Sequence, residues 1–278
     1  MTLAVSAIYG REIYLMSDLK LSYEEERNSV AGIGTPEDGL KLFFLSRRIA
    51  VTYSGTSESA HQAITQARAL ASAGNGSAGV ASFLKKKADE TNDEFLLADI
   101  SGRRPTVYKI SANLFSSTRR AKFWIGDRDA ADTLLRNNNL DSFSLERNFQ
   151  ELLESRRIPT VGGIAVTACG NLKGFKFVPK MTLVSPYYGT RPQAVNWGNA
   201  AVGGFGYTTL VPIEPGNNGW GVHFFQGHLG YFYRVDIDQN IYEKLTWRDT
   251  ELQNAIDALQ AELGITLESC GQLGVTSA

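Results

Sequence analysis

The chain switches between two hydrophobic periods, and the order of the switches constrains its fold. Strand-like alternation comes in adjacent pairs: "LAVSAIYGREIYLMSD" turns at Gly10–Arg11, and "GLKLFFLSRRIAVTYSG" turns at residues 46–48. Helical spacing follows at 57–72, with Ser57 as the expected N-cap, and again at about 79–90. Because strands joined by such short turns run antiparallel, the sequence predicts antiparallel hairpins followed by helices.

A second block repeats this order. The segment "EFLLADISGRRPTVYKIS" predicts a hairpin and "KFWIG" predicts a short strand. Helices are expected at 128–136 and 144–156, and "GGIAVTACGNLKGFKFV" predicts a third hairpin. Paired hairpins that alternate with paired helices are typical of sheets covered by helices. We therefore expect an α+β fold, a four-layer αββα sandwich of two antiparallel sheets flanked by helices.

The pattern changes after residue 185, so we expect a core at 1–185 and a C-terminal extension at 186–278 packed on the same domain. Residues 186–219 are rich in Gly, Pro and Asn and predict long loops. The segment "GWGVHFFQGHLGYFYRVD" predicts one more strand pair. A last helix is expected at 250–263, opening with the capping box "TELQ".

Composition excludes several classes of function. The formal net charge of -1 gives no overall attraction to nucleic acid or to an anionic membrane, so neither is an expected partner. Cys169 and Cys270 lack metal-type spacing, and His61, His223 and His228 are scattered. We expect neither a metal nor a cofactor. The chain shows no signal-peptide pattern and no apolar run of transmembrane length, which favours a cytoplasmic protein.

Four residues have a spacing that suggests chemistry. Thr2 opens the first strand, and Asp18 follows it by sixteen residues in "MSDLK". Lys41 opens "KLFFL", and Gly55 ends "VTYSG" fourteen residues later. This set resembles the proteasome β-subunit branch of the N-terminal nucleophile (Ntn) hydrolases, as a divergent bacterial member. The resemblance covers about residues 2–184 and supports the sandwich expected above.

The resemblance also implies weaker supporting roles for Lys20, Ser54, Gly126 and Asp127. The chain departs from the family pattern at several of its positions. Asp127 stands where the family has an accessory serine, and Lys20 stands where it usually has arginine. Ile158 and Val161 replace an expected Asp and Ser. Asp127 also fits a helix N-cap, which is the simpler interpretation of an acid at that place.

The resemblance implies a threonine-type hydrolase of peptides or other amides. Removal of Met1 would expose Thr2, whose hydroxyl would be the nucleophile and whose own amine the base. Lys41 would favour the reactive forms of both groups, Asp18 would pair with Lys41, and the Gly55 N–H would bind the oxyanion. The family also implies a homo-oligomer, a ring or stacked rings, whereas an unfoldase partner cannot be inferred.

A second interpretation is a catalytically inactive structural ring subunit that retains Met1. Each residue also has an ordinary explanation by itself. Thr2 fits the start of a strand, Lys41 an outward-facing strand position, and Gly55 a turn between a strand and a helix. Whether Met1 is removed distinguishes the two interpretations, and an intact-mass measurement shows it.

Overall fold

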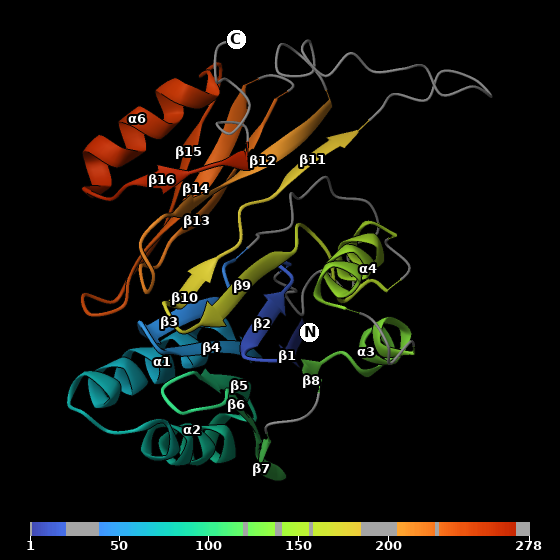
Figure 1. Ribbon diagram of the computed structural model, residues 1–278, viewed down its shortest axis with the longest axis vertical. Coiled ribbons are helices and arrows are strands. Elements are labelled where there is room, and N and C mark those ends of the chain that lie inside the picture. Colours follow the sequence, from blue (N-terminus) through green and yellow to red (C-terminus); the bar gives the residue numbers. More distant parts are fainter. Residues whose placement is uncertain are drawn as a thin grey trace. The chain divides into compact units, whose positions relative to one another are not determined.

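The computed structural model of the protein describes residues 2–20, 39–118, 122–136, 141–155, 158–184, 205–225 and 228–270. It divides into two compact units, Met1–Lys176 with Ile237–Asn240, and Phe177–Asp236 with Ile241–Ala278. The described part is a mixed α+β fold with three antiparallel sheets and five helices. Figure 1 labels these elements along the chain. Met1 lies outside the described residues.

The first sheet of unit 1 contains both strands of the first predicted hairpin and both strands of the third. Its strand order is β10-β9-β2-β1-β8, and every pairing given for it is antiparallel. Ala4 lies opposite Ser17 in the β1–β2 pair, and Leu3 lies opposite Gly126 in the β1–β8 pair. The strands span β1 Leu3–Tyr9, β2 Glu12–Ser17, β8 Phe123–Gly126, β9 Val166–Asn171 and β10 Gly174–Phe177.

The second sheet of unit 1 is a meander in which neighbours in sequence are neighbours in space. Its order is β3-β4-β5-β6-β7, again antiparallel throughout. Ser54, the last residue of β4, lies opposite Glu94, the first residue of β5. The strands span β3 Leu42–Ser46, β4 Ile49–Ser54, β5 Glu94–Asp99, β6 Thr106–Ser111 and β7 Leu114–Thr118.

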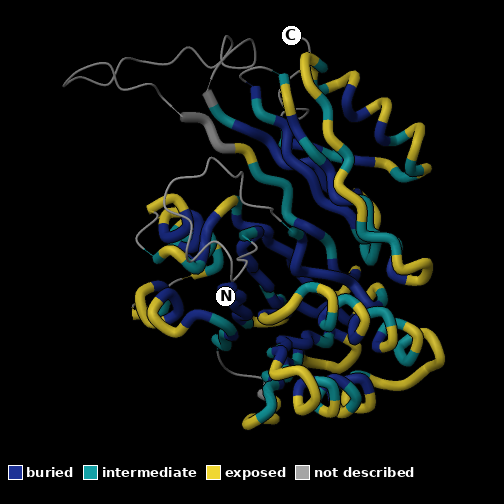
Figure 2. Tube along the Cα trace, turned by 180° about the vertical axis from the view of Figure 1, so that it is seen from behind, coloured by how far each residue is buried: buried dark blue, intermediate teal, exposed yellow. Residues whose placement is uncertain are grey.

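Each sheet of unit 1 has its own pair of helices. Helix α1 (Ser57–Ser72) contacts β3 and β4, and α2 (Ser77–Thr91) contacts β5 and β6. Helices α3 (Arg128–Leu135) and α4 (Ser142–Glu154) join a hydrophobic cluster with the apolar residues of β1 and β2. Exposed residues gather on the helices and turns, while the strands are mostly buried (Figure 2).

Alternation along β1 determines what each of its faces contacts. Leu3, Val5 and Ala7 lie in the cluster with α3 and α4, so Ala4 and Ser6 project from the opposite face. Strand β1 also contacts β4 and β5 of the second sheet. The two sheets of unit 1 are therefore packed neighbours, and the start of β1 lies where they meet.

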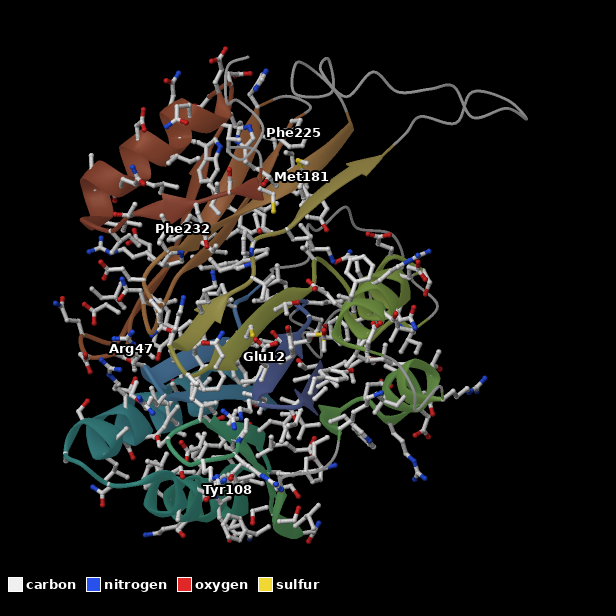
Figure 3. All side chains as sticks on the ribbon, viewed as in Figure 1. Glu12, Arg47, Tyr108, Met181, Phe225 and Phe232 are labelled. Atoms are coloured by element: carbon white, nitrogen blue, oxygen red, sulfur yellow. The ribbon has the colours of Figure 1, made fainter. Side chains whose placement is uncertain are left out.

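The two sheets are also joined at their hairpin turns. Arg47, between β3 and β4, donates from Nε to the Lys173 carbonyl at 2.7 Å (Figure 3). The Arg47 carbonyl accepts from the Phe175 N–H at 2.9 Å. The Phe175 ring stacks on Phe44 with 6.0 Å between ring centroids. Hydrogen bonds and an aromatic pair therefore fix the β3–β4 turn to the β9–β10 hairpin.

Unit 2 has its own sheet and its own core. The order is β11-β12-β13-β14-β15, with β16 paired to β12. Leu210 and Phe232, the latter labelled in Figure 3, pack with Ile256, Leu259 and Leu267. The elements span β11 Met181–Val184, β12 Phe205–Pro212, β13 Trp220–Phe224, β14 Leu229–Asp236, β15 Ile241–Trp247, α6 Leu252–Leu263 and β16 Leu267–Glu268.

Some expectations about local structure are wrong. Strand β12 lies within 186–219, where long loops were expected, and residues 186–204 lie outside the described part. Thr56, not Ser57, is the N-cap of α1, and its side chain makes no capping hydrogen bond. The final helix begins at Leu252 without a capping box, because the Thr250 hydroxyl donates to the Arg248 carbonyl instead.

The boundary between the compact units also differs from the expected one. Unit 2 begins at Phe177, ahead of residue 185, because β11 joins the sheet that contains β12. The described helices are all too short or too polar to cross a membrane.

Burial gives one residue of α1 an unusual protonation behaviour. The His61 ring packs edge-on against Phe43 and Tyr53, with ring centroids 5.5 and 5.6 Å away. This burial lowers the pKa of His61 to about 4, from an ordinary value of 6.5. The imidazole is therefore held in its neutral form within the folded protein at neutral pH.

We predict that His61 makes stability fall in mild acid. Between about pH 6.5 and 4 the unfolded chain binds a proton at His61 and the folded chain does not, so stability is lost as pH falls. The loss is at most about 3 kcal/mol. Urea unfolding at about pH 7 and about pH 4.5 should show a smaller loss for His61→Gln than for wild type.

His223 must be kept in both proteins of that comparison. Burial and the nearby His228 lower the pKa of His223 to about 4 as well, so its contribution cancels in the difference. Equal losses of stability in wild type and His61→Gln would contradict the prediction.

Candidate active site

A buried ion pair joins Lys41 to Asp18. Asp18 directly follows β2, Lys41 directly precedes β3, and the Lys41 Nζ lies 2.9 Å from Asp18 Oδ1. Their side chains are 1% and 0% exposed. Charges removed from water this completely are stable only when they are paired and hydrogen-bonded. The expected contact between Asp18 and Lys41 is confirmed, and the outward-facing interpretation of Lys41 is wrong.

Backbone groups complete the hydrogen bonding of this pair. Asp18 Oδ1 also accepts from the Leu3 N–H at 3.3 Å, and Asp18 Oδ2 accepts from the Gly162 N–H at 3.3 Å. The Lys41 Nζ donates to the Lys20 carbonyl in a very short hydrogen bond. Burial raises the pKa of Asp18, while Lys41 and the two peptide donors lower it. The pair thus gathers groups from four separate segments.

The same pair links Lys41 to the start of β1 through the Leu3 N–H. Leu3 N and Lys41 Nζ share one acceptor, Asp18 Oδ1, at distances of 3.3 and 2.9 Å. The separation of the two nitrogens therefore cannot exceed these two distances added together. The nitrogen of the Thr2–Leu3 peptide bond and the ammonium are therefore joined through one carboxylate oxygen. Thr2 itself is 4% exposed, and its carbonyl accepts from the Asp127 N–H at 2.8 Å.

Gly126 packs directly on Thr2 from the end of β8. Its φ is +90°, and a Cβ at this position would lie 1.8 Å from the Thr2 carbonyl oxygen. The same Cβ would lie 3.0 Å from Ser54 Oγ. No other residue fits here, because the backbone conformation and the space both require glycine. Ser54 and Gly126 thus flank the Thr2 carbonyl.

Gly55 follows Ser54, and its need for glycine has a structural origin. Its φ is +143°, and a Cβ would lie 2.0 Å from Asp93 Oδ1. Asp93 is buried and accepts from the Thr56 N–H at 2.9 Å and from the Ser59 hydroxyl at 2.6 Å. The turn interpretation of Gly55 therefore accounts for the glycine.

Asp127 is the N-cap of α3, as the simpler interpretation expected. Its Oδ1 accepts from the Ala130 N–H at 2.9 Å, and its Oδ2 accepts from the Thr160 hydroxyl in a short hydrogen bond. The Lys20 Nζ donates to the Pro159 carbonyl at 2.6 Å. Residues 158–163 are thereby tied to the site through Thr160, Pro159 and Gly162.

Ile158 and Val161 serve the core. Val161 is 3% exposed and lies in the cluster of β1, α3 and α4, and Ile158 packs against that cluster. Sequence reasoning missed Asp93, Thr160 and Gly162, since each acts on residues distant in the chain. Only "GG" at 162–163 was a local signal of close backbone approach.

No family model matches the sequence, and no curated protein matches it. The site therefore has to be interpreted from its own geometry. Within the described ranges, no three or more His, Cys, Asp and Glu side chains are grouped to hold a metal ion. The groups that do meet are the backbone around Thr2, a buried ammonium–carboxylate pair and the Gly126 turn with the Ser54 hydroxyl beside it.

We predict that the ion pair is energetically coupled. Lys41→Met or Asp18→Asn alone leaves one buried group without its partner and should cost about 3–5 kcal/mol of unfolding free energy. The double variant removes both charges and should cost clearly less than the sum of the single losses. Urea unfolding of the four proteins measures the coupling. Additive losses would show that the two charges do not interact.

Proposed function

We propose that the chain is a threonine-type Ntn hydrolase of peptides or other amides, and that its mature form starts at Thr2. The observation that carries the proposal is the shared hydrogen bonding of Asp18 Oδ1 with Lys41 and with the Leu3 N–H. A buried ammonium beside a threonine backbone is an electrostatic device for activating a hydroxyl. If Thr2 only began strand β1, it would not need a buried ammonium–carboxylate pair nearby.

The packing of unit 1 supports a four-layer αββα sandwich as the fold behind this site. One sheet packs with α1 and α2, the other packs with α3 and α4, and β1 contacts β4 and β5 across the sheets. In such a sandwich the start of β1 lies between the layers, near the ends of β4 and β8. This arrangement agrees with the contacts of Ser54 and Gly126 around the Thr2 carbonyl.

The proposed mechanism begins with the α-amine of Thr2. Its ordinary pKa of about 8 leaves a neutral fraction at neutral pH, and the Lys41 charge favours that neutral form. The amine takes the hydroxyl proton as the oxygen attacks the amide carbonyl, and the amide nitrogen leaves with a proton. Water then hydrolyses the ester on Thr2. The Gly55 N–H would donate to the oxyanion in both steps.

A second candidate function is an inactive subunit of a homo-oligomeric ring, with the peptide bond before Thr2 intact. The buried Val161 and the partly buried Ile158 favour it, because their apolar side chains occupy the positions where the family has Ser and Asp. The two candidates differ in one covalent fact, the residue at which the mature chain starts.

We predict that Thr2→Ala abolishes amide hydrolysis and labelling by an electrophilic probe. Thr2→Ser should retain part of both, because hydroxyl and amine survive. Thr246→Ala, at an exposed threonine of β15, is the matched control and should behave as wild type. Hydrolysis of a broad panel of fluorogenic peptides and amides measures activity, and intact mass shows whether the chain starts at Thr2.

Two results would overturn the proposed hydrolase. One is a purified chain in which Thr2 is preceded by another residue and which hydrolyses nothing in the panel. The other is hydrolysis that survives in Thr2→Ala, since this would assign the activity to a different nucleophile. The first result would leave the structural-subunit function in its place.

A further inference from the structure

Two neighbouring carboxylates at the start of β5 contact two glycine turns, the Gly55 turn and the Gly126 turn, and the Gly126 turn packs on the Thr2 carbonyl. We propose that Asp93 and Glu94 are positioning residues, which set the Gly55 turn and the Gly126 turn relative to Thr2. The inference rests on the proposed function, since it assigns these residues to the same site. Neither carboxylate needs to touch the substrate for this role.

Asp93 holds the Gly55 turn. Its Oδ1 fills the space in which a Gly55 side chain would lie and accepts from the next N–H, that of Thr56. Its Oδ2 accepts from the hydroxyls of Ser59 and Thr91, at 2.6 and 2.7 Å. One buried carboxylate therefore ties the start of α1 to the end of α2. Because the Thr56 N–H is hydrogen-bonded to Asp93, the peptide group between Gly55 and Thr56 is held in one orientation.

Glu94 holds the Gly126 turn. Its Oε2 accepts from the Gly126 N–H at 2.7 Å. The next N–H along the chain, that of Asp127, donates to the Thr2 carbonyl at 2.8 Å. Two successive peptide N–H groups thus have different acceptors: that of Gly126 binds Glu94, and that of Asp127 binds the Thr2 carbonyl. A hydrogen bond to an ionised acceptor is stronger than one between neutral groups, so the turn is held firmly against Thr2.

Asp93 and Glu94 are neighbours in the sequence, so the two turns that they contact are linked to each other. Glu94 lies opposite Ser54 in the β4–β5 pair, and Ser54 directly precedes Gly55. Ser54 Oγ also approaches Gly126. The separation of the turns is therefore set by the ladder between β4 and β5, which is buried and regular. Movement of β5 would displace the oxyanion donor and the Thr2 carbonyl together.

The test compares Glu94→Ala, Glu94→Gln and Asp93→Asn with wild type, and uses Glu58→Gln, at an exposed glutamate of α1, as the matched control. Glu94→Ala removes the acceptor of the Gly126 N–H, and Glu94→Gln keeps a neutral one. We expect kcat to fall at least about tenfold in Glu94→Ala and Asp93→Asn with KM little changed, since misplaced groups lose rate more than binding. Glu94→Gln should recover part of the loss.

A second readout does not depend on activity. In protein labelled with ¹⁵N-glycine, Glu94→Ala should shift the Gly126 amide resonance and speed its hydrogen exchange. Asp93→Asn should do the same for Gly55, and Glu58→Gln should change neither. Unchanged glycine amides, or an unchanged kcat in an active enzyme, would overturn the positioning role. If wild type hydrolyses nothing, the proposed function fails, and the amide readout alone decides whether the carboxylates hold the turns.

Discussion

The buried pair of Lys41 and Asp18 is the interaction on which the arrangement of unit 1 depends. Removing two charges from water is costly, and the cost is offset only when every remaining donor and acceptor finds a partner. Here the partners are backbone groups of Leu3, Lys20 and Gly162. These groups come from β1, from the residues after β2 and from the segment before β9. The pair therefore requires several strands to be in register at once.

Carboxylates recur as organisers around this pair. Asp127 caps α3 and accepts a hydrogen bond from Thr160. At the start of α1 the N-cap Thr56 makes no side-chain capping hydrogen bond, and Asp93 accepts from the Thr56 N–H instead. Helix starts leave backbone N–H groups without helical partners, and the positive end of the helix dipole favours an anion there. The acids thus fix the starts of α1 and α3, and the glycine turns before them take their shape from these contacts.

Much of this could be predicted from local patterns. Hairpins and helices of unit 1 follow from the period of the apolar residues, and the capping role of Asp127 follows from its place before a helix. What could not be predicted acts across the chain. Asp93 directly precedes β5 and Glu94 is its first residue, and nothing local indicates that they bind Thr56 and Gly126. The strand β12 was missed because Gly, Pro and Asn dominate the sequence before it.

The hydrogen bonds of the ion pair bear on how such a site could mature. Asp18 is bound by the N–H of Leu3, which is the nitrogen on the C-terminal side of Thr2. Cleavage before Thr2 would free a different nitrogen and leave this bond, and the Lys41 contact with Asp18, in place. The electrostatic environment is thus assembled by folding alone. Under the proposed function, maturation would break one peptide bond and would break neither of the hydrogen bonds that Asp18 makes with Leu3 and Lys41.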